Sequence, residues 1–104
     1  MYKYNAELVR VIDGDTVELD IDLGFHITAR QIVRLLGVDA PETRTKDLGE
    51  KARGFIVKDK VALAVFNANE IIVETEKQGS FKRWLGVIYC DGRNLNKQVE
   101  KWSK

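Results

Sequence analysis

Two short stretches of the chain place charged side chains where apolar, β-branched runs end. The first contains Asp13 and Asp15 on either side of a glycine, and the second contains Arg34, Asp39 and Glu42. Several carboxylates gathered in one place repel one another unless a cation lies between them. The guanidinium of an arginine can grip two phosphate oxygens at once. The two stretches therefore indicate a divalent cation and a phosphodiester as the partners of this chemistry.

Each of these residues also has an ordinary explanation when it is considered alone. Asp13 and Asp15 flank a glycine, as turn residues do. Asp39 and Glu42 lie around a proline and can cap a turn, and Arg34 can be an ordinary cation on a strand face. Only Asp13 is assigned the turn role; the other four are interpreted as one constellation.

The segments around these stretches have the alternation of β-strands. Residues 16–23 alternate strictly, with apolar residues on one face and acids on the other, which is typical of a half-buried antiparallel strand. Asp13 and Gly14 form a strong hairpin turn signal before it. Pro41 cannot donate a ladder hydrogen bond and is expected to end the third strand. The expected strands cover residues 7–12, 16–23, 27–38, 70–75 and 84–90.

Two helices are expected, because the apolar residues change to a helical spacing after the third strand. The main helix is predicted over residues 47–67, and a short one from Leu95 to about Trp102. In the main helix the lysines lie away from an apolar face, and this face is expected to pack against the strands. The residues near this face are Ala52, Phe55, Ile56, Leu63 and Phe66.

The order of three strands, a helix, two strands and a short helix predicts a mainly β protein with helices, of the α+β class. Three meandering strands and a returning pair close naturally into a five-stranded OB-type Greek-key barrel, with the main helix over one end. A single domain is expected over residues 1–104, because a second core would not fit. The faces and loops of OB barrels commonly bind oligonucleotides.

The net charge is only +1, but its distribution is uneven. Residues 1–23 have six acids and two bases, whereas residues 44–104 have thirteen bases and eight acids. This asymmetry can place a basic face beside an acidic pocket. No apolar run approaches the roughly 20 residues of a membrane span, so no membrane partner is expected. The N-terminus has no apolar signal segment, so a cytoplasmic location is expected, or a secreted one if a leader has been removed.

The lone cysteine and the lone histidine are assigned no chemistry. Cys90 lies in a strand-like run and is interpreted as a small buried hydrophobic residue, not as a nucleophile. His26 has no second histidine with which to form a metal site or a relay, and it is placed in a loop or at a strand edge.

Three motifs in the chain resemble those of the staphylococcal nuclease (thermonuclease) family, in the family's order and approximate spacing. They are DGDTV at residues 13–17, RLLGVDAPET at residues 34–43 and RWLGVIYCDG at residues 83–92. One short motif alone is weak support. Three in order, within a resemblance that covers residues 6–97, indicate similarity over nearly the whole chain.

The resemblance implies a calcium site. Asp15 and Asp39 match the family's two calcium-binding carboxylates, and the backbone carbonyl of Ala40 matches a further ligand. Calcium is a hard cation that takes several oxygen ligands in a flexible geometry, so carboxylates, a carbonyl and water suit it better than they suit magnesium.

The resemblance also implies catalytic and substrate-binding residues. Glu42 matches the residue that orients or deprotonates the attacking water, and Arg34 and Arg83 match two guanidiniums that clasp the scissile phosphate. The metal and the arginines would neutralise the phosphodiester and stabilise its five-coordinate transition state. Phe81 and Lys82 are assigned to substrate binding. Phe81 replaces a phosphate-contacting tyrosine, so it can stack on a base but cannot donate a hydrogen bond.

Two further departures from the family concern binding. Ala40 replaces a threonine, which leaves the carbonyl ligand but removes a side-chain contact. The sequence stops at Lys104, before the family's loop of nucleotide-stacking tyrosines and its last helix. We therefore expect weak nucleic-acid binding, and a surface around Trp102 that favours a homodimer or a protein partner.

These observations predict a calcium-dependent endonuclease that hydrolyses phosphodiester bonds of DNA and RNA by metal-assisted, in-line attack of water. The expected partners are single-stranded DNA and RNA. The alternative is a non-catalytic OB-type module that binds nucleic acid or protein, although the full charged set argues against it. A second alternative is a small structural domain of a larger assembly.

Overall fold

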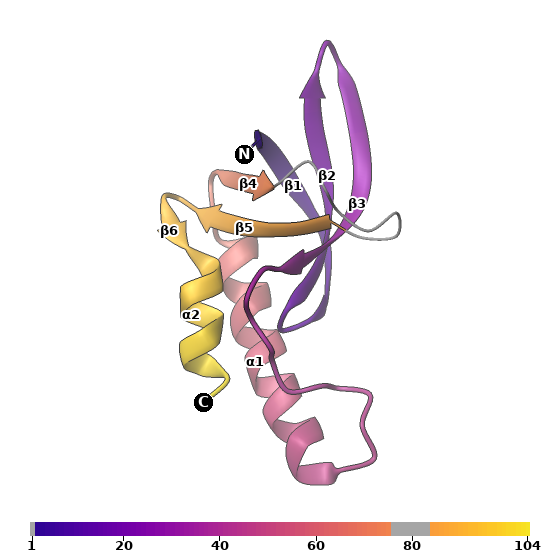
Figure 1. Ribbon diagram of the computed structural model, residues 1–104, viewed down its shortest axis with the longest axis vertical. Coiled ribbons are helices and arrows are strands. Elements are labelled where there is room, and N and C mark those ends of the chain that lie inside the picture. The colour runs from indigo at the N-terminus through magenta and orange to yellow at the C-terminus, as the bar shows by residue number, and fades with distance from the viewer. Residues whose placement is uncertain (1, 76–83) are drawn as a thin grey trace.

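The computed structural model describes residues 2–75 and 84–104, and it begins with a three-stranded antiparallel meander (Figure 1). The strands are β1 (Tyr2–Asp13), β2 (Thr16–Gly24) and β3 (Ile27–Leu35). In β2 the alternation buries Val17, Leu19 and Ile21 completely, as the sequence pattern predicts. β1 begins earlier than predicted, because residues 2–6 pair with a later strand.

A second group of strands closes this meander into a barrel. β4 (Ile71–Thr75) pairs with β1 and with β5 (Trp84–Cys90), and β5 in turn pairs in parallel with β3. The predicted five-stranded OB-type barrel of the α+β class is therefore confirmed. A two-residue strand, β6 (Arg93–Asn94), pairs with β5 and was not expected.

Two capped helices complete the fold. α1 (Leu48–Phe66) begins after Asp47, whose carboxylate accepts two backbone amides of the first turn. α2 (Leu95–Trp102) begins after Asn94, whose side chain accepts one. Both helices agree with the predicted segments. Within the described part of the chain, neither helix is long and apolar enough to cross a membrane.

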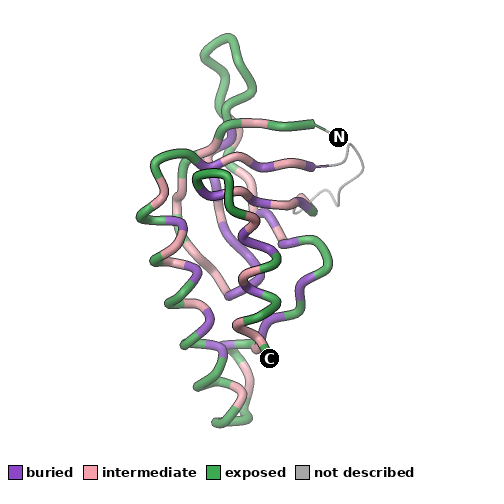
Figure 2. Tube along the Cα trace, turned by 90° about the vertical axis from the view of Figure 1, so that its left-hand side faces the viewer, coloured by how far each residue is buried: buried purple, intermediate pink, exposed green. Residues whose placement is uncertain are grey.

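The face of α1 that packs against the barrel differs from the predicted one. The buried positions are Gly54, Val57, Val61 and Val65, at intervals of three and four residues. Figure 2 shows buried and exposed stretches alternating along the helix. The predicted residues are exposed, namely Ala52, Phe55, Ile56, Leu63 and Phe66. The prediction is wrong because both faces are apolar, and the slimmer face of glycine and valine lets the helix lie closer to the barrel.

β3 ends at Leu35 and not at residue 38 as predicted. Gly37 has a φ of +75°, a left-handed conformation that glycine adopts readily and that turns the chain out of the strand. Pro41 therefore lies in the following loop and does not end the strand. This β3–α1 loop contains Asp39 and Glu42, so its anchoring determines where these acids lie.

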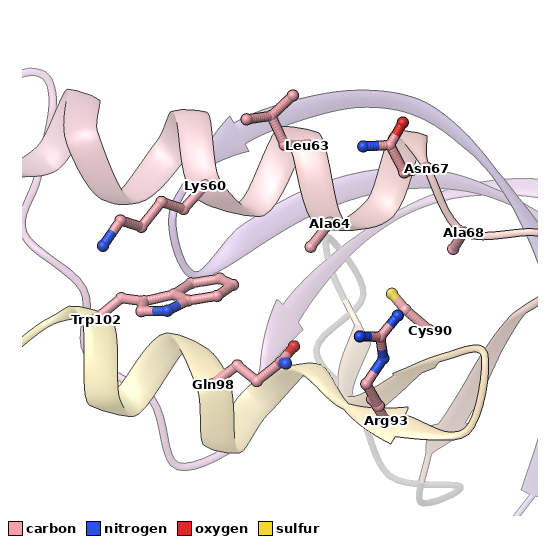
Figure 3. Close-up of a pocket in the computed structure, with 9 residues that line it drawn as sticks. All are labelled: Lys60, Leu63, Ala64, Asn67, Ala68, Cys90, Arg93, Gln98 and Trp102. Carbon is pink, nitrogen blue, oxygen red and sulfur yellow. The ribbon is translucent and has the colours of Figure 1, made fainter.

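Cys90 lies at one end of a groove of about 480 Å³ between α1 and α2, and Trp102 lies at the other (Figure 3). Burial, followed by the carboxylate of Asp91, raises the pKa of the Cys90 thiol to about 11, so the thiol is protonated at neutral pH. Its predicted burial is confirmed. His26 lies at the tip of the β2–β3 hairpin, which agrees with its placement in a loop.

Candidate functional site

The pairing of β2 with β3 brings Asp15 next to Arg34. Thr16 is the register partner of Arg34, and the amide of Leu35 donates to the carbonyl of Asp15 over 2.8 Å. One guanidinium nitrogen of Arg34, Nη2, lies 3.7 Å from Oδ2 of Asp15. The two charges therefore meet at the end of the barrel where β2 begins and β3 ends.

The carboxylate of Asp15 is fixed by its neighbours as well as by Arg34. Its Oδ1 accepts the hydroxyl of Thr16 at 3.0 Å, and its Oδ2 accepts the amide of Ala40 at 3.3 Å. Its side chain is only 10% exposed. Because Ala40 belongs to the β3–α1 loop, this bond ties the loop to the start of β2.

Asp39 lies on the solvent side of the same arginine. Its Oδ1 is 3.9 Å from Nη2 of Arg34, and its side chain is 98% exposed. Nη2 also donates to the carbonyl of Val38 over 3.5 Å. The guanidinium thus lies between a buried and an exposed carboxylate. Its own side chain is 32% exposed, so a ligand can reach it from solvent.

A second bond anchors the loop, and the sequence did not predict it. The hydroxyl of Thr43 donates to Oδ1 of Asp13 over 2.5 Å, and Thr43 is buried. Asp13 therefore does more than form the β1–β2 turn, because it also ties the loop that contains Asp39 to that turn. No local pattern signals a bond between residues so far apart in the chain.

Glu42 is exposed, and its backbone lies where α1 passes closest to the loop. Its amide donates to Oε1 of Glu50 over 3.5 Å. A Cβ placed on Gly54 would lie only 2.6 Å from the carbonyl oxygen of Glu42, so the absence of a side chain there permits this approach. The carboxylate of Glu42 forms no ion pair with another described residue and is open to water.

Asn96, on α2, links the same region to the rest of the barrel. Its Oδ1 accepts the amide of Ile88, and its Nδ2 donates to the carbonyls of Leu36 and Gly86, each at 3.1 Å. The side chain is buried. It fixes Leu36, where the chain leaves β3, and Leu36 is two residues after Arg34. No role was predicted for Asn96, because its partners are distant in sequence.

Three predicted site residues, Arg83, Phe81 and Lys82, lie outside the described residues. β5 begins directly after them at Trp84, which pairs with Val33 of β3. Their roles stay predictions that the family motif implies.

The donors around Arg34 suit a hard cation in type. Within residues 2–75 and 84–104, no three Asp, Glu, His or Cys side chains gather into a metal-binding cluster. Oxygens of Asp15 and Asp39 nevertheless lie 3.7 Å and 3.9 Å from the same guanidinium nitrogen, one on its buried side and one on its solvent side. Carboxylate oxygens are the ligands that calcium prefers, and backbone carbonyls and water complete such sites. The donor set therefore fits calcium.

The barrel and its charged site define an OB-type protein of the kind that binds nucleic acid. Residues 32–101 match the staphylococcal nuclease homologue family, and the chain belongs to that family of nucleases and nucleic-acid-binding proteins. The resemblance identified from the three motifs is thus confirmed. The matched range includes Arg34, Asp39 and Glu42, and the β2–β3 pairing adds Asp15 to them.

Among curated proteins, Protein ParB of Escherichia coli is 33% identical to the chain over 86 residues. The alignment covers 83% of this chain and 42% of ParB. The chain therefore spans less than half the length of that relative.

Proposed function

We propose that the chain is a calcium-dependent endonuclease that cleaves phosphodiester bonds of single-stranded DNA and of RNA. The observation that supports this most directly is the position of Arg34 between Asp15 and Asp39, in a member of the staphylococcal nuclease homologue family. A guanidinium suits a phosphate, and paired carboxylates suit a cation. One site thus offers carboxylates for the cation and a guanidinium for the phosphate, the two charged partners of a metal-assisted reaction.

Asp15, Asp39 and the carbonyl of Ala40 would hold the calcium ion, which supplies positive charge beside the scissile phosphate. Asp15 suits this role because Thr16 and the amide of Ala40 fix its carboxylate. Asp39 suits it because its side chain faces solvent, from which an ion and its waters enter.

Arg34 binds the phosphate and stabilises the negative charge that grows on its oxygens as water attacks. Arg83 is the second clasp that the family motif implies. Glu42 accepts a proton from the attacking water while the new bond to phosphorus forms and the leaving oxygen departs on the opposite side. The exposure of Glu42 on an anchored loop supports this role, because its carboxylate is accessible to water and its backbone is fixed.

The test is cleavage of fluorescent single-stranded DNA and RNA oligonucleotides in calcium, in magnesium and in excess chelator. We expect efficient cleavage with calcium and none with chelator. Glu42→Gln should lower turnover by about 10²–10⁴-fold, because it removes a general base. Its fold should be unchanged, since Glu42 is exposed. Lys97→Arg, an exposed change on α2, is the matched control.

Cleavage in excess chelator would exclude the calcium site, and parental turnover of Glu42→Gln would exclude Glu42 as the base. Binding of the oligonucleotides without cleavage would replace the proposal with its alternative, a non-catalytic OB-type binding module.

A further inference from the structure

The outer face of α1 is apolar and exposed along the whole helix. The exposed fractions are 80% for Leu48, 44% for Phe55, 57% for Ile56, 62% for Leu63 and 79% for Phe66. With about 100° of rotation per residue, these five positions fall within an arc of about 100°. They form one stripe, here called the outer stripe, over the 19 residues of α1, a length of about 28 Å.

The outer stripe lies opposite the face that packs against the barrel. Val57, Val61 and Val65 form that inner face and are at most 2% exposed. Leu63 points away from α2, whereas Ala64 is directed toward it (Figure 3). Covering one barrel requires only one apolar face, so core packing does not account for the second. Contiguous exposed apolar surface of this kind marks an interaction site.

Basic residues border the outer stripe on both sides. By the same helical geometry, Lys51 and Lys58 follow one edge, and Arg53 follows the other. Lys60 also falls at that second edge, but its Nζ lies 5.9 Å from the ring centroid of Trp102, toward α2 (Figure 3). Nζ of Lys58 lies 5.8 Å from the ring centroid of Phe55, a member of the stripe. Positive charge therefore lies along both edges of the stripe, and an occupant with negative charge at its own edges would complement it.

This charge pattern argues against a second copy of the chain as the occupant. Asp59 lies within the stripe, near its middle. In both parallel and antiparallel helix pairs, the basic borders of the two copies would face each other. An antiparallel pair centred on the stripe would also place the two Asp59 side chains together. A homodimer through the outer stripe is thus disfavoured, whereas the homodimer expected from the sequence concerns the surface around Trp102 and stays a prediction.

The same pattern argues against a lipid bilayer and a nucleic acid. An anionic bilayer would accept the basic borders and the apolar stripe, but Asp59 would enter the apolar layer without a partner. A phosphate backbone gains nothing from exposed leucine and isoleucine, and it repels Asp59. A protein can instead offer a cation at that point.

We propose that the outer stripe is a docking surface for an amphipathic helix of another protein. That helix would have an apolar stripe, acidic borders and one basic residue near its centre. Its apolar side chains would pack against the outer stripe, as in other amphipathic-helix recognition, and its acids would pair with the basic borders. Its central base would pair with Asp59. None of these α1 residues belongs to the candidate site, so the inference does not depend on the nuclease proposal.

The probe is a synthetic peptide as long as α1, with leucine at its apolar positions, glutamate along both borders and one lysine at its centre. Its dissociation constant from the whole 104-residue chain is measured by fluorescence anisotropy. Ile56→Ser and Leu63→Ser should each weaken binding about tenfold or more, because each removes an exposed anchor. The matched control is Leu23→Ser, which removes a 40% exposed leucine from β2 and should leave binding unchanged.

A charge swap makes the test specific. Asp59→Lys should weaken binding of the lysine-centred peptide, and a glutamate-centred peptide should restore it. A peptide with lysine borders should not bind the parent chain. Circular dichroism verifies that each variant is folded, and Leu48→Ser, at the most exposed position of the stripe, replaces any variant that is not.

Four results would overturn the proposal. They are equal binding of the acidic-bordered and basic-bordered peptides, no binding of either, binding that is indifferent to the stripe variants, and failure of the charge swap. Stripe-dependent binding to phosphatidylserine vesicles in preference to the peptide would assign the surface to lipid. A stripe-dependent dimer in analytical ultracentrifugation would assign it to a second copy.

Discussion

One guanidinium nitrogen of Arg34 lies close to two carboxylates that differ in environment. Asp15 is mostly buried and hydrogen-bonded, whereas Asp39 is almost fully exposed. Coulombic attraction across the exposed side is weakened by solvent and by salt. We therefore expect Asp39 to change partner most readily, and Asp15 to keep its position when a cation or a phosphate arrives.

The arginine geometry gives a prediction at the residue scale. Arg34→Lys keeps the positive charge but loses the planar fork that can bind two phosphate oxygens. We expect turnover on single-stranded DNA to fall by about 10–100-fold, which corresponds to the loss of one charged hydrogen bond. Steady-state kinetics of this variant and of Lys97→Arg measure the effect. If Arg34→Lys turned over at the parental rate, turnover would depend only on a positive charge at this position and not on the planar fork of arginine.

At the scale of elements, the β3–α1 loop is anchored on three sides. Ala40 bonds to Asp15, Thr43 bonds to Asp13, and the carbonyl of Glu42 lies against Gly54 of α1. Two of the anchors come from the β1–β2 turn, and the third comes from α1. The loop is therefore positioned by the barrel and by the helix together.

Two glycines of α1 provide a matched pair for testing this arrangement. Gly54→Ala introduces a methyl group 2.6 Å from a backbone oxygen, so we expect a loss of about 1–3 kcal/mol in the free energy of unfolding. Gly49→Ala places its methyl 3.4 Å from Oδ1 of Asp47, an ordinary contact distance, and alanine's helix propensity should stabilise the variant by up to about 1 kcal/mol. Urea denaturation distinguishes the two. Equal stabilities would show that the helix shifts without cost at Gly54.

Asn96 should be among the least replaceable polar residues. Asn96→Ala removes the side-chain partner of the buried Ile88 amide and one partner from each of the Leu36 and Gly86 carbonyls. The Gly86 carbonyl keeps the amide of Leu36, so the cost of about 1–3 kcal/mol for an unsatisfied buried group falls mainly on the Ile88 amide. We expect a large drop in melting temperature. Asn69→Ala, at an exposed position, is the control and should melt like the parent. A small effect of Asn96→Ala would indicate that water replaces the side chain.

The sequence predicts most elements of this fold, because their signals are local. Alternation places Val17, Leu19 and Ile21 in the core, and Asp47 marks the start of α1. The packing face of α1 is not predictable from spacing, since helical periodicity identifies apolar faces but not which of two faces meets the barrel. The end of β3 depends on the left-handed Gly37, which the nearby Pro41 obscures.

The candidate site is predictable only in part. Arg34 and Asp39 are recognised from a family motif, and the structure places Arg34 against both Asp15 and Asp39. The supporting bonds of Thr43 and Asn96 join residues that are distant in sequence, and isolated threonines and asparagines carry no signal of such partners. Sequence therefore indicates the candidate site residues, and the fold shows what positions them.

At the scale of the whole molecule, the two ends of the β2–β3 hairpin differ in charge. Asp20, Asp22, Glu7 and Glu70 line a hollow near the hairpin tip, whereas Arg34 lies at the other end of the strands. The acidic hollow repels a polyanion, and at the other end Asp15 and Asp39 offset the charge of Arg34. We therefore expect nucleic acid to approach the Arg34 end when a bound cation neutralises these two carboxylates.

This charge distribution predicts a local and salt-sensitive binding mode. The affinity for single-stranded DNA should fall linearly with salt on logarithmic axes, with a slope of about −0.7 for each phosphate contacted. Arg34→Ala should make that slope shallower by about 0.7, the share of one phosphate contact. Fluorescence anisotropy across a salt series measures both slopes. An affinity indifferent to salt would show that apolar contacts dominate binding.

The parallel pairing of β3 with β5 also affects the order in which the segments of the protein fold. Arg34 and Leu85 are register partners, although all of α1 and β4 lies between them in the chain. Bringing together such distant segments is slow, because the entropy of the intervening chain is lost before the pairing stabilises it. The hairpins and α1 have mostly local contacts and can form first. We therefore expect the β3–β5 pairing, which completes the strand framework around Arg34, to form late when the chain refolds.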